Sequence, residues 1–364
     1  MLATAKLPIT ARSLQVRAGL LLLDASGVLI RDVSDALRSG TVERQNTLDI
    51  HGSYNFETYD EYDWANVRFM PYQTLTGDGV TETYYLGVYV PQTPQLPKTN
   101  GPWSVQCLDQ LSLLSDEVGD TYCVSWAASY LTAVQNIIEA RIPGAVVLLD
   151  PQAAATVPSD WLVWPLITGE PYTWLGVCNM LLSMVGYGPL WCDSLGRFRA
   201  EPLRDLATKA PTFVLDIADP LTDIVEPEWV VTREYGADAK AAINWWRFVQ
   251  QGFAILPAQP PWEGTGFYTV DRSGGGLKRK RVKVIPAADQ ATLEAQGDQA
   301  VRDDTQMVTT MRISTGPRPD LGHQDVVGFQ GDPRLPAARW WARSYSIPQR
   351  PSDGKVTMTL ERLE

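Results

Sequence analysis

The chain of 364 residues is long enough for two or three domains, and its 45% hydrophobic and 20% charged residues are typical of a folded globular protein. Its net charge of −11 argues against wholesale binding to nucleic acid, and no apolar run is long enough to cross a bilayer. The four cysteines, Cys107, Cys123, Cys178 and Cys192, show no metal-type spacing, so we expect synthesis in a reducing, intracellular compartment.

Residues 1–115 carry the pattern of a β domain. Between residues 48 and 58 apolar and polar side chains alternate, which predicts a strand with one buried face and one polar face that carries His51. An earlier strand is predicted over 14–20, and later strands over 67–72 and 83–90. Many short strands joined by turns are typical of sandwiches and barrels.

Residues 116–203 carry helical as well as strand patterns. Apolar residues recur at helical spacing over 127–140, and a second helix is predicted from Trp174 to Val185, with Gly186 at its C-terminal cap. Residues 188–200 then predict a hairpin whose turn lies at 193–196. We therefore expect a small α+β unit.

Residues 204–364 return to strand patterns, with an excursion at about 240–303. Strands are predicted there over 241–246, 264–270 and 277–285, and the last two flank a glycine-rich turn at 273–276. A polar helix is predicted over 288–303, and three strands at 306–315, 325–329 and 355–363 end the chain. The sequence thus predicts a mainly β protein with an α+β insert.

No residue pattern predicts catalysis or a bound cofactor. The two histidines, His51 and His323, have no cysteine, aspartate or glutamate at the spacing of a zinc site, and no familiar catalytic or phosphate-binding motif occurs. The acidic run at 60–63 has the carboxylates that calcium prefers, but it lacks the alternation and the glycine of a calcium loop, so we expect a solvated loop. We expect a protein that is not an enzyme and has no cofactor or catalytic residue.

One basic run is a candidate for contact with a partner. It consists of Lys278, Arg279, Lys280 and Arg281. Such a run contacts phosphate, nuclear import machinery or an acidic partner, or it lies on a solvated hairpin arm, and the glycine-rich turn before it favours the hairpin arm.

Two pairs of adjacent tryptophans are the other candidates. Trp245–Trp246 and Trp340–Trp341 could stack on sugars or bases. Adjacent aromatic residues on a strand are more often one core residue and one interface residue, so we expect these pairs to serve the core and a subunit interface.

The order of these motifs resembles that of minor tail proteins from long-tailed actinobacterial phages. The matching stretches are GTVERQNTLDIHG at 40–52, Trp64, RFMPYQTL at 68–75, VGDTY at 118–122, GY at 186–187 and LWCDSLGRFRAEP at 190–202. The C-terminal order is similar to that of tail hub proteins: a strand around Asn244, a hairpin, a helix, a strand at 325–327 and a final strand ending at 356–360. Gln324 stands where hub proteins usually place a glycine.

The resemblance covers nearly the whole chain and implies two β-barrels similar to tail-tube subunits, over residues 1–115 and 204–364, with the unit at 116–203 between them. It also implies a homotrimer, because two barrels from each of three copies would match a sixfold tail tube to a threefold tip around the DNA channel. The acidic balance fits a bore through which DNA slides without binding. We therefore expect a structural virion protein of the phage tail tip, made in the cytoplasm of the bacterial host.

The partners implied by the resemblance are the distal tail protein ring, the C-terminus of the tape-measure protein and a central fibre or receptor-binding tip protein, with DNA present only in transit. Two alternatives stay open. One is a distal-tail or carbohydrate-binding baseplate module, which the tryptophans favour, and the other is a cell-wall hydrolase of the tail tip.

Overall fold

The computed structural model describes most of the chain. The described residues are 14–77, 79–95, 101–119, 122–124, 128–151, 161–164, 172–203, 206–216, 228–231, 245–250, 262–264, 280–285, 287, 289–305, 309–331 and 339–363. Lys278 and Arg279, the strand residues predicted at 241–244 and 265–270, and the turn predicted at 273–276 lie outside them. Among the described residues, no helix combines the length and the apolar character needed to span a membrane.

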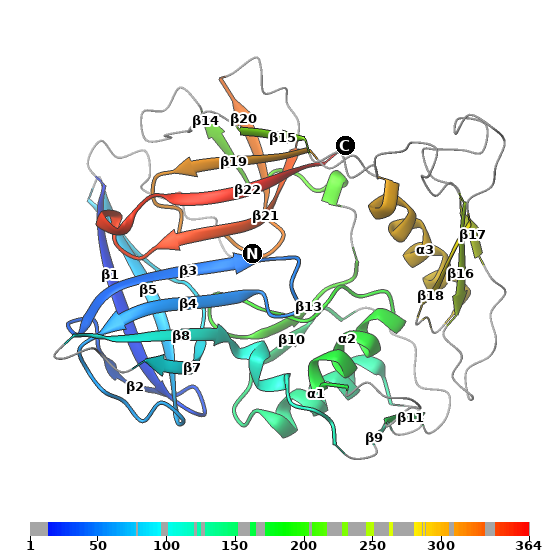
Figure 1. Cartoon of the computed structure of the whole chain (residues 1–364), viewed down its shortest axis with the longest axis horizontal. Helices are drawn as coiled ribbons and strands as arrows, with labels where there is room; N and C mark the ends of the chain where they lie inside the picture. Colours follow the sequence, from blue (N-terminus) through cyan, green and yellow to red (C-terminus); the bar gives the residue numbers. More distant parts are fainter. Residues whose placement is uncertain are drawn as a thin grey trace.

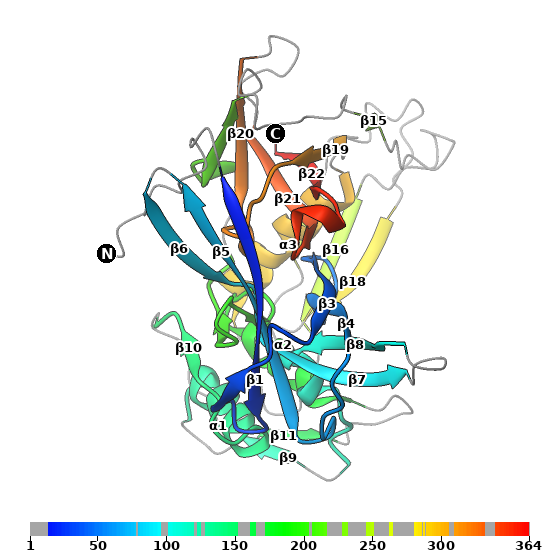
Figure 2. The same ribbon diagram turned by 90° about the vertical axis from the view of Figure 1, so that its left-hand side faces the viewer.

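The largest element is a 14-stranded sheet whose strands come from both ends of the chain (Figure 1). Its path is β15-β19-β22-β21-β3-β4-β8-β7-β5-β1-β2, with β6 beside β5, and with β14 beside β20, which itself pairs with β21. Figure 2 shows the sheet folding back, with β5 and β6 on one side of β1 and β3, β4 and β8 on the other.

The strands of this sheet form two groups in the sequence. The N-terminal group is β1 (Gln15–Asp24), β2 (Leu29–Asp32), β3 (Leu37–Gln45), β4 (Gly52–Thr58), β5 (Val67–Gly77), β6 (Val80–Tyr85), β7 (Tyr89–Gln95) and β8 (Trp103–Asp109). The C-terminal group is β14 (Phe213–Asp216), β15 (Glu228–Val231), β19 (Thr309–Thr315), β20 (Val326–Gln330), β21 (Arg339–Pro348) and β22 (Val356–Leu363). The predicted mainly β architecture is confirmed, and closure of the two segments into barrels stays a prediction.

Strand β4 shows how the alternating pattern is used. Gly52, Tyr54, Phe56 and Thr58 are buried and the residues between them are not, as the period of two predicts. The strand begins at Gly52 rather than at residue 48, because the backbone N–H of Gln45 donates to the His51 carbonyl at 2.8 Å and closes a loop over 46–51. The first half of the predicted strand is therefore wrong.

Strand β21 joins the two groups, and the sequence analysis missed it. It pairs with β22, with β20 and, from Ser344 opposite Gln45 to Pro348 opposite Thr41, with β3. A bulge between Ala342 and Ser344 breaks the alternation that would have predicted the strand. Side chains from both ends of the chain then form one core, with Trp340 beside Phe329 and with β3 and β4 residues in the same cluster.

The predicted α+β unit is present between the two groups. It contains α1 (Tyr130–Arg141), α2 (Trp174–Met184), the 3-10 helix η2 (Gln110–Leu114) and the short strands β9 (Tyr122–Val124), β10 (Val147–Leu149), β11 (Trp161–Trp164), β12 (Trp191–Cys192) and β13 (Phe198–Ala200). Ser129 and Thr173 cap the two α-helices by accepting hydrogen bonds from the third backbone N–H beyond them. Gly186, with φ +74°, ends α2 as predicted.

The excursion forms a separate three-stranded sheet with one helix. Its strands are β17 (Trp262–Gly264), β16 (Trp245–Gln250) and β18 (Lys280–Ile285), in that order, and its helix is α3 (Gln290–Thr305). The predicted helix is confirmed. Strand β18 runs parallel to β16, and β17 pairs with the other edge of β16, while the hairpin predicted around the turn at 273–276 lies largely outside the described residues. A short 3-10 helix η3 (Leu206–Thr208) precedes β14, and another, η4 (Pro351–Asp353), links β21 to β22.

A buried glutamine closes the junction at the end of β21. Gln349 is fully buried, accepts a hydrogen bond from the Tyr54 hydroxyl at 2.6 Å and donates to the Gly19 carbonyl at 2.9 Å. Gln73 donates to the Gln349 carbonyl at 2.9 Å. One side chain therefore ties β21 to β4 and β1, and β5 holds its backbone.

We expect Gln349→Leu to lower the free energy of unfolding by about 2–4 kcal/mol, because it leaves the buried Tyr54 hydroxyl and Gly19 carbonyl without their partner. Chemical denaturation followed by tryptophan fluorescence measures this. Gln106→Leu, at an exposed position on β8, is the matched control and should change stability by less than about 0.5 kcal/mol. Equal effects of the two substitutions would contradict the role given to Gln349.

Candidate functional site

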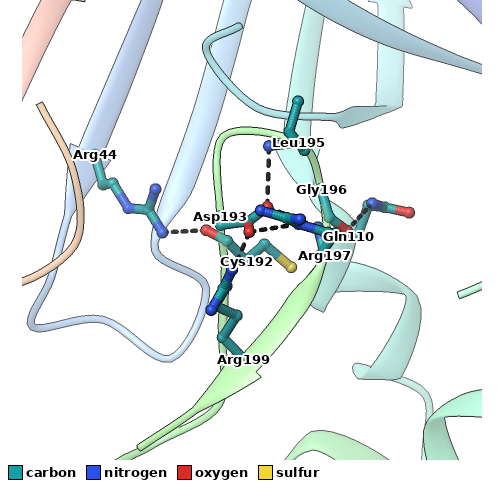
Figure 3. A network of polar contacts seen from close by, with 8 residues as sticks. All are labelled: Arg44, Gln110, Cys192, Asp193, Leu195, Gly196, Arg197 and Arg199. Atoms are coloured by element: carbon teal, nitrogen blue, oxygen red, sulfur yellow. Dashed lines mark hydrogen bonds and ion pairs between the residues drawn. The ribbon is translucent and has the colours of Figure 1, made fainter. Parts of the chain in front are cut away.

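The tip of the β12–β13 hairpin is organised by one carboxylate (Figure 3). Asp193 accepts hydrogen bonds from the backbone N–H of Leu195 and of Arg197, each at 3.0 Å, and from the Nε atoms of Arg197 and Arg199 at 2.8 and 2.9 Å. Burial by itself raises the pKa of Asp193, but the hydrogen bonds from Arg199 and Arg197 outweigh it and lower the pKa. The predicted turn at 193–196 is therefore confirmed and carries a stable negative charge.

The same turn is fastened to the main sheet. Gln110, at the start of η2, donates to the Gly196 carbonyl at 2.6 Å and accepts a hydrogen bond from Arg68 of β5. Gly196 has φ +75°, and a Cβ atom there would lie 2.4 Å from the Gln110 amide nitrogen and 2.6 Å from a methyl group of Val88. Only glycine fits this conformation and this close approach.

Arg44 of β3 makes the second attachment. Its guanidinium donates to the Cys192 carbonyl, which comes 148 residues later in the chain (Figure 3). The same group lies 5.8 Å from the centre of the Trp191 ring. It also faces Asp109, which caps η2 and accepts a hydrogen bond from the Gly52 N–H at 2.7 Å. Burial raises the pKa of Asp109 to about 6, and the charge of Arg44 opposes that rise.

Three aromatic rings stack beside Arg44. The ring of His323 lies between the ring of Trp191, at 4.5 Å, and that of His51, at 5.2 Å, and both pairs are close to parallel. The column therefore joins the hairpin, the loop before β20 and the loop before β4. We call these three rings with Arg44 the stacked joint.

The hydrogen bonds around His323 show which of its two ring nitrogens is protonated. Asn46 donates from its amide nitrogen to the Ala342 carbonyl at 2.8 Å, so its amide oxygen faces Nδ1 of His323 at 3.2 Å and Nδ1 carries the proton. Burial, followed by the charge of Arg44, lowers the pKa of His51 to about 4, and the same causes hold the pKa of His323 well below its ordinary value. Both rings are neutral at pH 7.

His51 was expected on the polar face of a strand, and that expectation is wrong. It lies in the loop before β4 and is only 4% exposed, because the loop folds inward until the ring meets His323. His323 itself was singled out by the sequence only as an unpaired histidine. The burial of His323 depends in part on the ring of His51, which lies 272 positions earlier in the chain, so no local sequence pattern could predict it.

The sequence-predicted contact residues lie in two separate places. Trp340 is 1% exposed and belongs to the core of the main sheet, and Trp341 beside it is half-buried. Trp340 therefore packs as predicted and cannot stack on a sugar. Trp245 and Trp246 belong to β16 and Lys280 and Arg281 to β18, so the structure brings these four positions together in the small sheet.

The acidic run and the cysteines make contacts that stabilise the fold and do not form a metal site in the described residues. Asp60 pairs with Arg31 at 3.5 Å, and Tyr62 is buried with its ring edge on Phe69. Within the described ranges, no three histidine, cysteine, aspartate or glutamate side chains converge on a metal position, and the four cysteines are free. Burial raises the pKa of the Cys192 thiol well above its ordinary value, so it stays protonated and is a poor nucleophile.

The chemistry of the stacked joint is therefore structural. Arg44 of the joint, together with Arg68 and the carboxylate of Asp109 beside it, makes hydrogen bonds that connect the α+β unit to the sheet. The sequence analysis missed this joint, and the one signal in its favour was that both histidines of a histidine-poor chain lie in or beside predicted strands.

Structural comparison finds the same fold in phage tail proteins. The chain matches the tail protein from Neisseria meningitidis with a TM-score of 0.61 at 15% identity, over 95% of this chain and 96% of that one. It matches the 43 kDa tail protein of prophage MuSo2 from Shewanella oneidensis with a TM-score of 0.56 at 12% identity, over 95% and 98%. It matches an Escherichia coli type VI secretion component, described as similar to the T4 tail proteins gp27 and gp5, with a TM-score of 0.50 at 10% identity, over 97% and 77%.

By sequence, no protein-family model and no curated protein matches the chain. The structural likeness establishes that the chain has the fold shared by phage tail proteins and by hub-like components of type VI secretion systems. Because the two ends of the chain meet at β21, that fold is continuous over nearly the whole length.

We expect Gly196→Ala to lower the free energy of unfolding by about 2–4 kcal/mol, since it combines a left-handed backbone with overlap against Gln110 and Val88. Gly27→Ala is the matched control: its φ is +85°, but nothing lies within 4 Å of the added methyl group. The control should cost only about 1–2 kcal/mol. Denaturant titration of both variants measures the difference, and equal losses would show that the hairpin tip is not fastened to the sheet.

His51→Phe should change how stability depends on pH, because it keeps a ring against His323 but cannot take up a proton. His51 has a pKa of about 4 when folded and about 6.5 when unfolded, so the unfolded chain binds the proton first as the pH falls through that window. The wild-type protein therefore loses up to about 3 kcal/mol between pH 7 and pH 4 that the variant retains.

The measurement is the difference in unfolding free energy between the two proteins at each pH. Asp109, whose raised pKa has the opposite effect over the same range, is present in both and cancels in the difference. A difference that stays constant from pH 7 to pH 4 would show that His51 is not buried in its neutral form.

Proposed function

We propose that this chain is a structural protein of the phage tail, and that it forms the trimeric hub of the tail tip. In this role it joins the sixfold tail tube, or the distal tail ring, to the threefold tip and surrounds the DNA channel. It has no catalytic activity. The observation that carries the proposal is the likeness to the Neisseria tail protein, which covers 95% of one chain and 96% of the other.

The charge and the construction of the chain support this role. A net charge of −11 disfavours tight contact with DNA phosphates, which suits a protein past which DNA slides. The continuous sheet and the stacked joint hold three parts of the chain in one arrangement, which a ring under mechanical load requires. The proposed partners are the distal tail ring, the tape-measure C-terminus and a central fibre or receptor-binding protein.

The proposed setting is the virion, at the tip of the tail, after synthesis in the bacterial cytoplasm. The alternative of a carbohydrate-binding baseplate module rested on exposed tryptophans. Trp340 is inside the core, so it lends no support to that alternative.

We expect the purified full-length chain to have a mass three times the 40.3 kDa of one copy, and to appear in electron micrographs as a ring with a central opening. Mass photometry over a concentration series, followed by negative staining, tests this. Antibody against the chain should label the tail tip of intact particles. Material that stays at 40.3 kDa and forms no ring, together with particles that are not labelled at the tip, would overturn the proposal.

A further inference from the structure

Strand β1 is apolar on both of its faces. Leu20 and Leu22 belong to the core of the main sheet, whereas Leu21 and Leu23 belong neither to that core nor to the core of the α+β unit. They line an open cavity of about 370 Å³ between the main sheet and the α+β unit. Because protein interiors are closely packed, an apolar strand face that meets a cavity instead of side chains leaves room for a ligand.

Three neighbouring strands place their side chains in register on one side of this cavity. Arg68 of β5 lies opposite Leu23 of β1, and Leu23 lies opposite Leu29 of β2. The loop at 144–146 and the hairpin tip at 195–197 line the other side. One arginine and two leucines therefore form a row along the cavity wall.

The arginine in this row has no ion-pair partner in the described part of the chain. Arg68 is 7% exposed, and the hydrogen bond to Gln110 uses one of its five N–H donors. Asp24 is the carboxylate whose charge acts on it, but that carboxylate already accepts hydrogen bonds from the backbone N–H of Ser26 and Val28, at 2.8 and 2.9 Å. A buried cation without an adjacent counter-charge favours an anionic ligand.

Aliphatic side chains extend the apolar surface beyond the cavity. Val28, Leu29, Ile30, Val146 and Leu148 are between 40% and 62% exposed. Within the described ranges β2 pairs with β1 alone and β10 with β13 alone, so both strands have an open edge, and β2 lies at an outer edge of the main sheet (Figure 1). A small molecule inside the cavity would leave these side chains and edges uncovered, whereas an extended peptide covers them.

We propose that this cavity binds an extended segment of a partner protein that carries an aliphatic residue beside a carboxylate. The aliphatic side chain packs against Leu21 and Leu23, the carboxylate accepts hydrogen bonds from Arg68, and the backbone of the segment adds to the open edge of β2. The proposal goes beyond the hub role, because it does not depend on how many copies of the chain assemble.

A library of random octapeptides displayed on yeast is the probe for the first experiment. It is selected with the full-length chain and counter-selected with the Leu29→Asp variant, whose new carboxylate lies in the same row as Arg68 and repels an acidic ligand. We expect the enriched peptides to carry aspartate or glutamate next to an aliphatic residue. The matched control is Val80→Asp, at an exposed valine of another edge strand, β6, and it should select the same peptides as the wild-type chain.

The second experiment tests Arg68 itself. The most enriched peptide is synthesised with its acidic residue and with glutamine in that place, and both are titrated against the chain by fluorescence anisotropy. The acidic peptide should bind the wild-type chain about tenfold more tightly or better, since a hydrogen bond to a charged group is worth about 1.5–3 kcal/mol. With Arg68→Met the two peptides should bind equally weakly.

A control on folding accompanies this variant, because Gln110 loses a partner when Arg68 is replaced. Thermal melting of Arg68→Met shows whether the chain still folds. Leu29→Asp changes an exposed side chain and leaves that hydrogen bond in place, so its loss of peptide binding tests the same site independently.

The outcomes separate this inference from the proposed function. A selection that enriches no acidic and aliphatic pattern, or a glutamine peptide that binds the wild-type chain as tightly as the acidic one, overturns the inference and leaves the hub proposal standing. Binding of sodium decanoate that Arg68→Met abolishes, without any enriched peptide, would assign the cavity to a small carboxylate instead. Loss of self-association in Leu29→Asp, again without any enriched peptide, would assign it to a second copy of the chain.

Discussion

Backbone pairing along β21 is the constraint on which the rest of the structure depends. This strand lies between β22 and β3, so the last third of the chain and the first third share one sheet and one core. Contacts this distant in sequence carry a large entropic cost of loop closure, which burial of the shared core must exceed. Because the N-terminal and C-terminal groups of strands are paired with each other, the chain between them must leave the main sheet and return to it. The α+β unit and the small sheet are therefore attached to the outside of the main sheet.

The α+β unit is attached by buried polar groups rather than by apolar packing alone. Asp193 shapes the hairpin tip, Gln110 holds it from η2, and Arg44 reaches it from β3. Polar groups in a dry environment must find particular partners, so they favour one arrangement over many similar ones. The neutral histidine rings complete this joint, and because burial disfavours their protonation, acid weakens it.

These attachments suit a protein whose task is to hold a shape. The hub proposed above connects rings of different symmetry, so its subunits must keep their parts in fixed positions while presenting different surfaces to different neighbours. The main sheet buries apolar side chains in a core that the two ends of the chain build together.

The sequence by itself determined the local elements: both helices of the insert, α3, the 193–196 turn and the alternation of β4, because each depends on residues within a few positions of one another. Only the tertiary structure decided the rest. The bulge in β21 interrupts its alternation, so the sequence shows no period of two there. The parallel partner of β18 lies more than thirty residues earlier in the chain. His51 is buried by the ring of His323 on a distant loop. Pairing and burial between remote segments arise from packing, and local periodicity carries no record of them.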